Sequence, residues 1–147
     1  MRKLILSVFL FFCTNFLWGQ DRVRRIREID SNVRRIDSDT LVALFIDKGQ
    51  KAAFYKDGEI VKVRNSVLHV GVKTFDYYFL KDKVIMLHIT HRIDSNNLLV
   101  DTYYLLDKKK IISKRVLGTD LWRNDEWSSK YVIEQANHIR TTFARQD

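Results

Sequence analysis

The chain has 147 residues, and its 26 Lys and Arg residues outnumber its 18 Asp and Glu residues, which gives a formal net charge of +8. This length allows one domain at most, and a single cysteine excludes an intrachain disulfide framework. The basic balance points to an anionic partner, unless the charge only keeps the protein soluble.

Residues 1–20 have the layout of a secretory signal peptide. Arg2 and Lys3 precede an apolar run, and Gly19 is the small residue before the expected cleavage site. A membrane anchor is the alternative, but the apolar run of roughly 15 residues is shorter than the ~20 that a spanning helix needs. We therefore expect an exported protein of the periplasm, the outer envelope or the medium. Its mature part, residues 21–147, is expected to be a single domain without a transmembrane segment.

Cleavage would change both the chemistry and the charge of the chain. It removes Cys13, so the mature domain would hold no thiol for a disulfide, a nucleophile or a metal. It also removes two basic residues, which leaves 24 against 18 acidic ones and a net charge of about +6. An exported protein rarely meets nucleic acid, so the expected partners are an anionic envelope lipid or glycan, or an acidic protein surface.

The first segment of the mature domain predicts an amphipathic helix with a basic outer face. Apolar residues recur at spacings of three and four, while arginines occupy the opposite side. The apolar positions are Val23, Ile26, Ile29, Val33 and Ile36, and the arginines are Arg24, Arg27, Arg34 and Arg35. A membrane-surface role is the alternative, but the apolar side has no Trp or Phe anchor, so packing against the domain itself is favoured.

Between Leu41 and Val116 the pattern changes to β-strands. Runs rich in β-branched and aromatic residues alternate with short turn signals such as Lys56-Asp57-Gly58. Short connections join antiparallel neighbours, so the expected sheet is a meander.

The strand region repeats one hairpin unit. Asp57, Asp82 and Asp107 are spaced by 25 residues, and an aromatic residue stands three positions before each of them. A short turn and an aliphatic run follow in each copy, FYKDGEIV, YFLKDKVI and YYLLDKKKII. A repeat of this kind indicates one supersecondary unit that is used three times to extend a shared sheet.

The C-terminal segment predicts a loop followed by a helix. Asn124 is the expected N-cap, and Trp122 and Trp127 bracket the helix entry, where they would pack the helix onto the sheet. The apolar side of the helix consists of Val132, Ala136, Ile139 and Phe143. The predicted fold is therefore α+β, an antiparallel meander sheet of six or seven strands with an N-terminal and a C-terminal helix packed on one face.

Motifs for catalysis or metal binding do not emerge from the sequence. His88 and His91 are three residues apart on an expected strand, so they point to opposite faces and cannot share a metal without a bulge. The Asp-Ser-Asn stretch at Asp94 does not continue to the glutamate that closes a calcium loop. A nucleophile elbow, a phosphate loop and a dinucleotide fingerprint are also missing from the sequence. We expect no enzyme, no cofactor and no metal site.

Aromatic and basic side chains form the candidate binding surface. Strand alternation splits the tyrosines between two faces, one of which we expect to be core beneath the helices. The other face would expose Tyr55, Lys62, Arg64, Tyr78 and Tyr103. This combination suits the binding of a glycan, a peptide or another protein, although strand propensity alone also explains the tyrosines.

The hairpin segments are AFYKDGEIVKV, DYYFLKDKVIML and DTYYLLDKKKIISK, and they follow a leader that ends in Gly19-Gln20. Together they resemble a class of small exported bacterial proteins in which aromatic-rich hairpins recur between terminal helices. The class has no established activity, so the resemblance implies no functional residues. Lys83 and Lys108 replace the usual turn glycine, which suggests longer turns. The hairpins also resemble repeat modules of toxin and immunity systems.

The leading functional prediction is an exported, non-catalytic domain that binds a partner through its sheet. The alternative is an inhibitor or immunity-type protein that blocks a secreted hydrolase, although no single loop is long enough to stand out as the inhibitory plug. A small enzyme is the third possibility and would need a cleft that holds a perturbed acid or base.

Overall fold

The structure is a computed structural model that describes residues 2–69, 71–93, 98–118 and 127–144. The helices are α1 (Arg2–Ser38) and α2 (Ser129–Ala144), and a short 3-10 helix, η1 (Asp47–Gly49), joins the first two strands. The strands are β1 (Val42–Ile46), β2 (Lys51–Lys56), β3 (Glu59–His69), β4 (Gly71–Leu80), β5 (Lys83–Ile93), β6 (Leu98–Asp107) and β7 (Lys110–Leu117).

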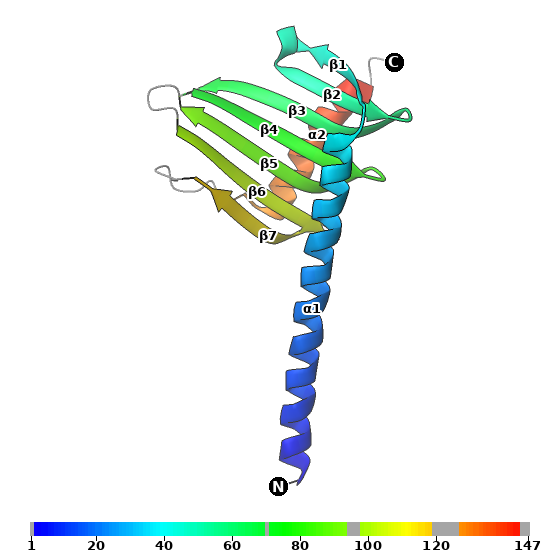
Figure 1. Ribbon diagram of the computed structural model, residues 1–147, viewed down its shortest axis with the longest axis vertical. Helices are drawn as coiled ribbons and strands as arrows, with labels where there is room; N and C mark the ends of the chain where they lie inside the picture. The colour runs from blue at the N-terminus through cyan, green and yellow to red at the C-terminus, as the bar shows by residue number, and fades with distance from the viewer. Residues whose placement is uncertain (1, 70, 94–97, 119–126, 145–147) are drawn as a thin grey trace.

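The seven strands form one antiparallel sheet in the order β1-β2-β3-β4-β5-β6-β7 (Figure 1). Each strand pairs with the next one in the sequence, so the predicted meander is confirmed. Three of the hairpins are joined by only two residues, which leaves no room for a crossover connection and forces antiparallel pairing.

These three hairpins share the same backbone geometry. Their central turn pairs are Asp57-Gly58, Lys81-Asp82 and Lys108-Lys109, and all six residues have positive φ values between 47° and 81°. Positive φ at both central residues is typical of the type I′ turn, whose twist matches that of the flanking strands. The register also shifts beside each turn, which places a β-bulge at the same point in all three hairpins. The predicted hairpin repeat is therefore confirmed.

The register of the repeat differs from the one that the sequence suggested. Asp57 is the first residue of its turn, Asp82 is the second residue of its turn, and Asp107 is the last residue of β6. Measured from turn to turn, the spacing is 24 residues from Asp57 to Lys81 and 27 from Lys81 to Lys108. The missing glycines do not lengthen the turns, because lysine and aspartate adopt the positive φ values instead.

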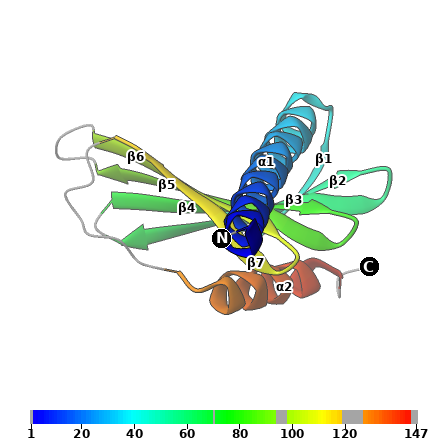
Figure 2. The same ribbon diagram turned by 90° about the horizontal axis from the view of Figure 1, so that it is seen from below.

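The two helices lie on opposite faces of the sheet, as Figure 2 shows. The prediction that both pack on one face is therefore wrong. The physical reason is that consecutive residues of the central strands are apolar, so both faces need cover from water. Tyr77 and Phe79 point to the face that α2 covers (the α2 face), whereas Tyr78 between them points to the face that α1 covers (the α1 face).

Each face has its own core cluster. The α2 face buries the predicted apolar side of α2, which consists of Val132, Ala136, Ile139 and Phe143. The α1 face buries Ile29, Val33 and Ile36 of α1 against Tyr78, Met86 and Leu105. The arginines predicted for the outer side of α1 are exposed, so the amphipathic pattern of α1 is confirmed from Ile26 to Ile36, whereas the predicted apolar position Val23 is 48% exposed.

The ends of the two helices differ in how they meet the sheet. The first part of α1 extends away from the sheet, and its second part crosses the α1 face (Figure 1). Within the described part of the chain, neither helix is long and apolar enough to cross a membrane.

At α2, Ser128 Oγ accepts a hydrogen bond from the Tyr131 backbone N–H at 3.2 Å and caps the helix. The Trp127 ring packs 5.4 Å from the Phe75 ring, as expected for the helix entry, whereas Trp122 and Asn124 lie outside the described residues.

Candidate functional site

The predicted binding surface is split between the two faces of the sheet. Four of its five residues lie on the α1 face, namely Lys62, Arg64, Tyr78 and Tyr103. Tyr55 instead packs against the core beneath α2. Its neighbour Phe54 takes the corresponding place on the α1 face, where Lys62 Nζ lies 5.8 Å from the centre of its ring.

Tyr78 and Lys62 are engaged by α1. Only 2% of Tyr78 is exposed, and its hydroxyl donates one hydrogen bond that is shared between the two carboxylate oxygens of Asp37, each 3.1 Å away. Lys62 Nζ lies 2.9 Å from an Asp37 oxygen and 4.5 Å from the centre of the Tyr78 ring. Burial, and then the nearby carboxylates, raise the pKa of Tyr78, so its hydroxyl stays protonated and keeps donating. These residues fasten α1 to the sheet.

Arg64 and Tyr103 also have internal partners. Arg64 donates from Nε and Nη2 to the two oxygens of Asp76 at 2.7 and 2.8 Å, and this bidentate bond raises the pKa of the guanidinium. Asp76 itself is only 5% exposed. The Tyr103 ring stacks on His88 at 4.3 Å, and His88 Nε2 lies 2.8 Å from Asp101 Oδ1. The polar groups of this face therefore satisfy one another, and a ligand would have to compete with them.

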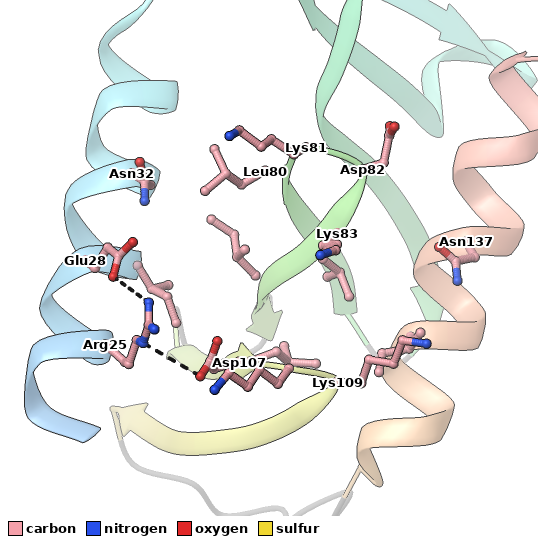
Figure 3. A pocket seen from close by; sticks show the side chains of 16 residues that line it. Arg25, Glu28, Asn32, Leu80, Lys81, Asp82, Lys83, Asp107, Lys109 and Asn137 are labelled. Carbon is pink, nitrogen blue, oxygen red and sulfur yellow. Dashed lines mark hydrogen bonds and ion pairs between the residues drawn. The ribbon is translucent and has the colours of Figure 1, made fainter. Parts of the chain in front are cut away.

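A groove opens at the end of the sheet where the turns between β4 and β5 and between β6 and β7 lie, with α1 on one side and α2 on the other (Figure 3). Its volume of about 610 Å³ falls within the range of small-molecule sites. Six aliphatic side chains line it, namely Ile29, Leu80, Val84, Ile85, Leu106 and Ile133. It is hereafter the turn-end groove.

The acidic and basic side chains of the turn-end groove differ in whether they form ion pairs with described residues. Its carboxylates each lie near an arginine: Glu28 and Asp107 are 3.1 and 4.0 Å from Arg25, and Asp82 is 2.5 Å from Arg140. Its four lysines have no ion pair with any described residue; they are Lys81, Lys83, Lys108 and Lys109. The groove therefore presents a positive potential over an apolar lining.

Arg25 contributes a further donor on the α1 side of the groove. Its Nη1 bonds to Glu28, but its Nε is 4.0 Å from Asp107, which is too far for a hydrogen bond. This Nε is buried and has no hydrogen-bond partner among the described residues. Leaving such a donor unsatisfied costs about 1–3 kcal/mol, so an oxygen acceptor bound beside it would be stabilised.

The two turns at the groove use residues that their geometry disfavours. Type I′ turns prefer Asn-Gly or Asp-Gly, and the turn outside the groove has Asp57-Gly58. The groove turns place lysine at positive φ, at Lys81 and at Lys108 and Lys109. Lys48, outside the groove, also has a positive φ of 55°, so the backbone geometry alone does not mark the groove, and its case depends on the lining described above.

From the sequence, these lysines were interpreted as turn residues, and Lys83 and Lys108 as replacements of the usual turn glycine, but not as a binding site. The feature that could have identified them is that the turn glycine is missing from two of the three hairpin copies, where Asp82 and Lys109 take its place, and a lysine precedes it in both. What the sequence could not show is that both turns lie beside two helices from opposite ends of the chain.

No family model, curated protein or solved structure matches this chain. Within the described residues, His, Asp and Glu side chains do not gather in the groups of three that would hold a metal ion. The chemistry of the turn-end groove is therefore judged from its own side chains.

Proposed function

We propose that the protein is an exported, non-catalytic binding domain whose ligand is an amphiphilic anion held in the turn-end groove. The observation that carries the proposal is that six aliphatic side chains and four lysines without ion pairs to described residues line one groove. The aliphatic lining accepts a hydrocarbon chain, and the lysines accept a carboxylate or phosphate head group. The signal-like layout of residues 1–20 supports export.

The turn-end groove suits a ligand better than the aromatic and basic part of the α1 face. A ligand at Lys62 or Arg64 would have to displace Asp37 or Asp76, and each of these carboxylates already makes two hydrogen bonds or more. The groove lysines have no ion pair with a described residue, so the charge of a ligand there is not set against such a pair.

Calorimetric titration of the purified exported protein tests the ligand class. Dodecanoate and dodecyltrimethylammonium, below their micellar concentrations, and dodecanol, below its solubility limit, share one chain length and differ in head-group charge. We expect dodecanoate to bind with one-to-one stoichiometry, dodecanol about tenfold more weakly, and the cation most weakly. Equal affinity for all three, or no binding of dodecanoate, would refute the proposal.

A charge-matched pair of variants locates the site. Lys81→Gln with Lys109→Gln removes two groove charges, and we expect dodecanoate affinity to fall about tenfold at low salt and less at high salt. Arg34→Gln with Lys48→Gln removes the same net charge from exposed positions outside the groove and should leave affinity nearly unchanged. Equal losses in both variants would mean that only the overall charge attracts the ligand.

A further inference from the structure

The two edges of the sheet differ in how well they are protected against pairing with a strand of another chain. β7 forms one edge and carries basic residues at Lys110, Lys114 and Arg115, a common defence against edge-to-edge pairing. β1 forms the other edge, and its sequence VALFI contains no charged residue. Its outward backbone groups pair with no other described strand, because β2 is its only neighbour in the sheet.

The side chains of β1 are apolar and exposed. Val42 is 74% exposed, Phe45 61% and Leu44 37%. Leu44 pairs with Ala53 and Phe45 with Ala52, so alternate residues of β1 continue the α2 face and the α1 face respectively. An uncharged apolar edge of this kind is a template for another strand.

We propose that β1 pairs antiparallel with β1 of a second copy of the chain, giving a two-fold symmetric dimer with a continuous sheet. In the register that pairs all five residues, Leu44 lies opposite its own copy, Ala43 opposite Phe45, and Val42 opposite Ile46. The sequence is self-complementary in this register, because the small Ala43 makes room for the large Phe45 of the other copy and every contact is apolar.

Local charge pairing removes the main obstacle to self-association of a basic protein. Lys51 Nζ lies 2.5 Å from Asp47 at one end of β1, and Lys56 bonds to Asp39 at the other end. In the antiparallel dimer, the end with Asp47 of one copy lies beside the end with Asp39 of the other. The neighbouring charges are thus balanced within each copy. A five-residue strand pair is shorter than most stable interfaces require, so the dimer is a weak one with dissociation in the micromolar range.

Disulfide trapping in the full chain tests the register. With Cys13→Ser as background, Leu44→Cys places one thiol of each copy across the two-fold axis, where antiparallel partners are close enough for a disulfide. We expect a covalent dimer after mild oxidation of Leu44→Cys, and little from Val42→Cys or Ile46→Cys alone. A mixture of the last two variants should form the mixed dimer. Equal cross-linking at all three positions, or none at Leu44→Cys, would overturn the proposal.

Sedimentation of the purified protein tests the interface without a cross-link. Phe45→Lys should weaken self-association at least tenfold, whereas Leu117→Lys, at a position 60% exposed on the opposite edge strand, should not. Circular dichroism checks that both variants stay folded. A protein that remains monomeric well above micromolar concentration, or that loses association only through Leu117→Lys, would refute pairing through β1. These outcomes do not depend on the ligand of the turn-end groove.

Discussion

A buried phenol, a lysine and a carboxylate together hold α1 on the sheet. The Tyr78 hydroxyl and Lys62 Nζ both bond to Asp37, the last carboxylate of α1. The phenol can donate this hydrogen bond only while it is protonated, and burial with nearby carboxylates raises its pKa well above the ordinary value of about 10. Folding is therefore coupled to the protonation of Tyr78.

This coupling predicts a loss of stability at alkaline pH. Above pH ~10 the unfolded chain releases the proton of Tyr78 while the folded protein keeps it, so the unfolded state is favoured as pH rises. Each such tyrosine lowers the free energy of unfolding by about 1.4 kcal/mol per pH unit in this window. Tyr78→Phe should cost about 1 kcal/mol at pH 7, because one hydrogen bond is lost, but should flatten the decline above pH 10. Urea unfolding between pH 7 and 11 measures both effects.

Tyr77→Phe provides an independent comparison on the other face of the sheet. Burial also raises the pKa of Tyr77, so its replacement should flatten the same alkaline decline. If neither variant changes the slope, these phenols do not govern the alkaline stability of the protein.

At the scale of single elements, the three repeated hairpins fold alike although their turns differ in sequence. Their strands, turn positions and antiparallel pairing were predictable, because alternating apolar residues and short polar breaks are local signals. The turn-to-turn spacing was not, because one residue separates β3 from β4 whereas four residues separate β5 from β6. Aligning the hairpins on their aspartates therefore matched residues that occupy different turn positions.

The two turns at the groove should be less stable than type I′ turns that contain the preferred Asn-Gly pair. Lys108-Lys109→Asn-Gly replaces two left-handed lysines by the preferred type I′ pair, and we expect the free energy of unfolding to rise by about 1 kcal/mol. The same change should weaken dodecanoate binding, because it removes two groove cations. Urea unfolding and calorimetric titration of one variant measure the two effects together.

The turn outside the groove supplies the reverse substitution. Asp57-Gly58→Lys-Lys should lower the free energy of unfolding by a similar amount and leave ligand binding nearly unchanged. An Asn-Gly variant that is no more stable than the parent would show that the lysines at positive φ carry little strain.

At the scale of the whole molecule, the candidate site exists because the two helices lie on opposite faces of the sheet. The turn-end groove combines Arg25 of α1, the turn residues Lys81 and Lys109, and Asn137 of α2, which are far apart in the sequence. If both helices covered one face, as the sequence suggested, they could not stand on either side of the turns. Tyr78 was predicted to lie on a solvent-facing side of the sheet, but it is buried, since the aromatic residues of the strands supply core on both sides.

The two-sided core also predicts which parts of the chain the fold needs. Among the described side chains of α1, those that fix it to the sheet begin at Arg22, whose Nε donates to the Ile112 carbonyl at 2.9 Å, so residues 21–147 should unfold cooperatively on heating. Residues 41–147 lack α1 and lose the burial of Ile29, Val33 and Ile36, at about 1.5–3 kcal/mol each. The sum is comparable to the whole stability of a typical domain, so this shorter fragment should show no cooperative transition. Circular dichroism during heating distinguishes the two. A cooperative transition in the shorter fragment would mean that α2 and one face of the sheet suffice for the fold.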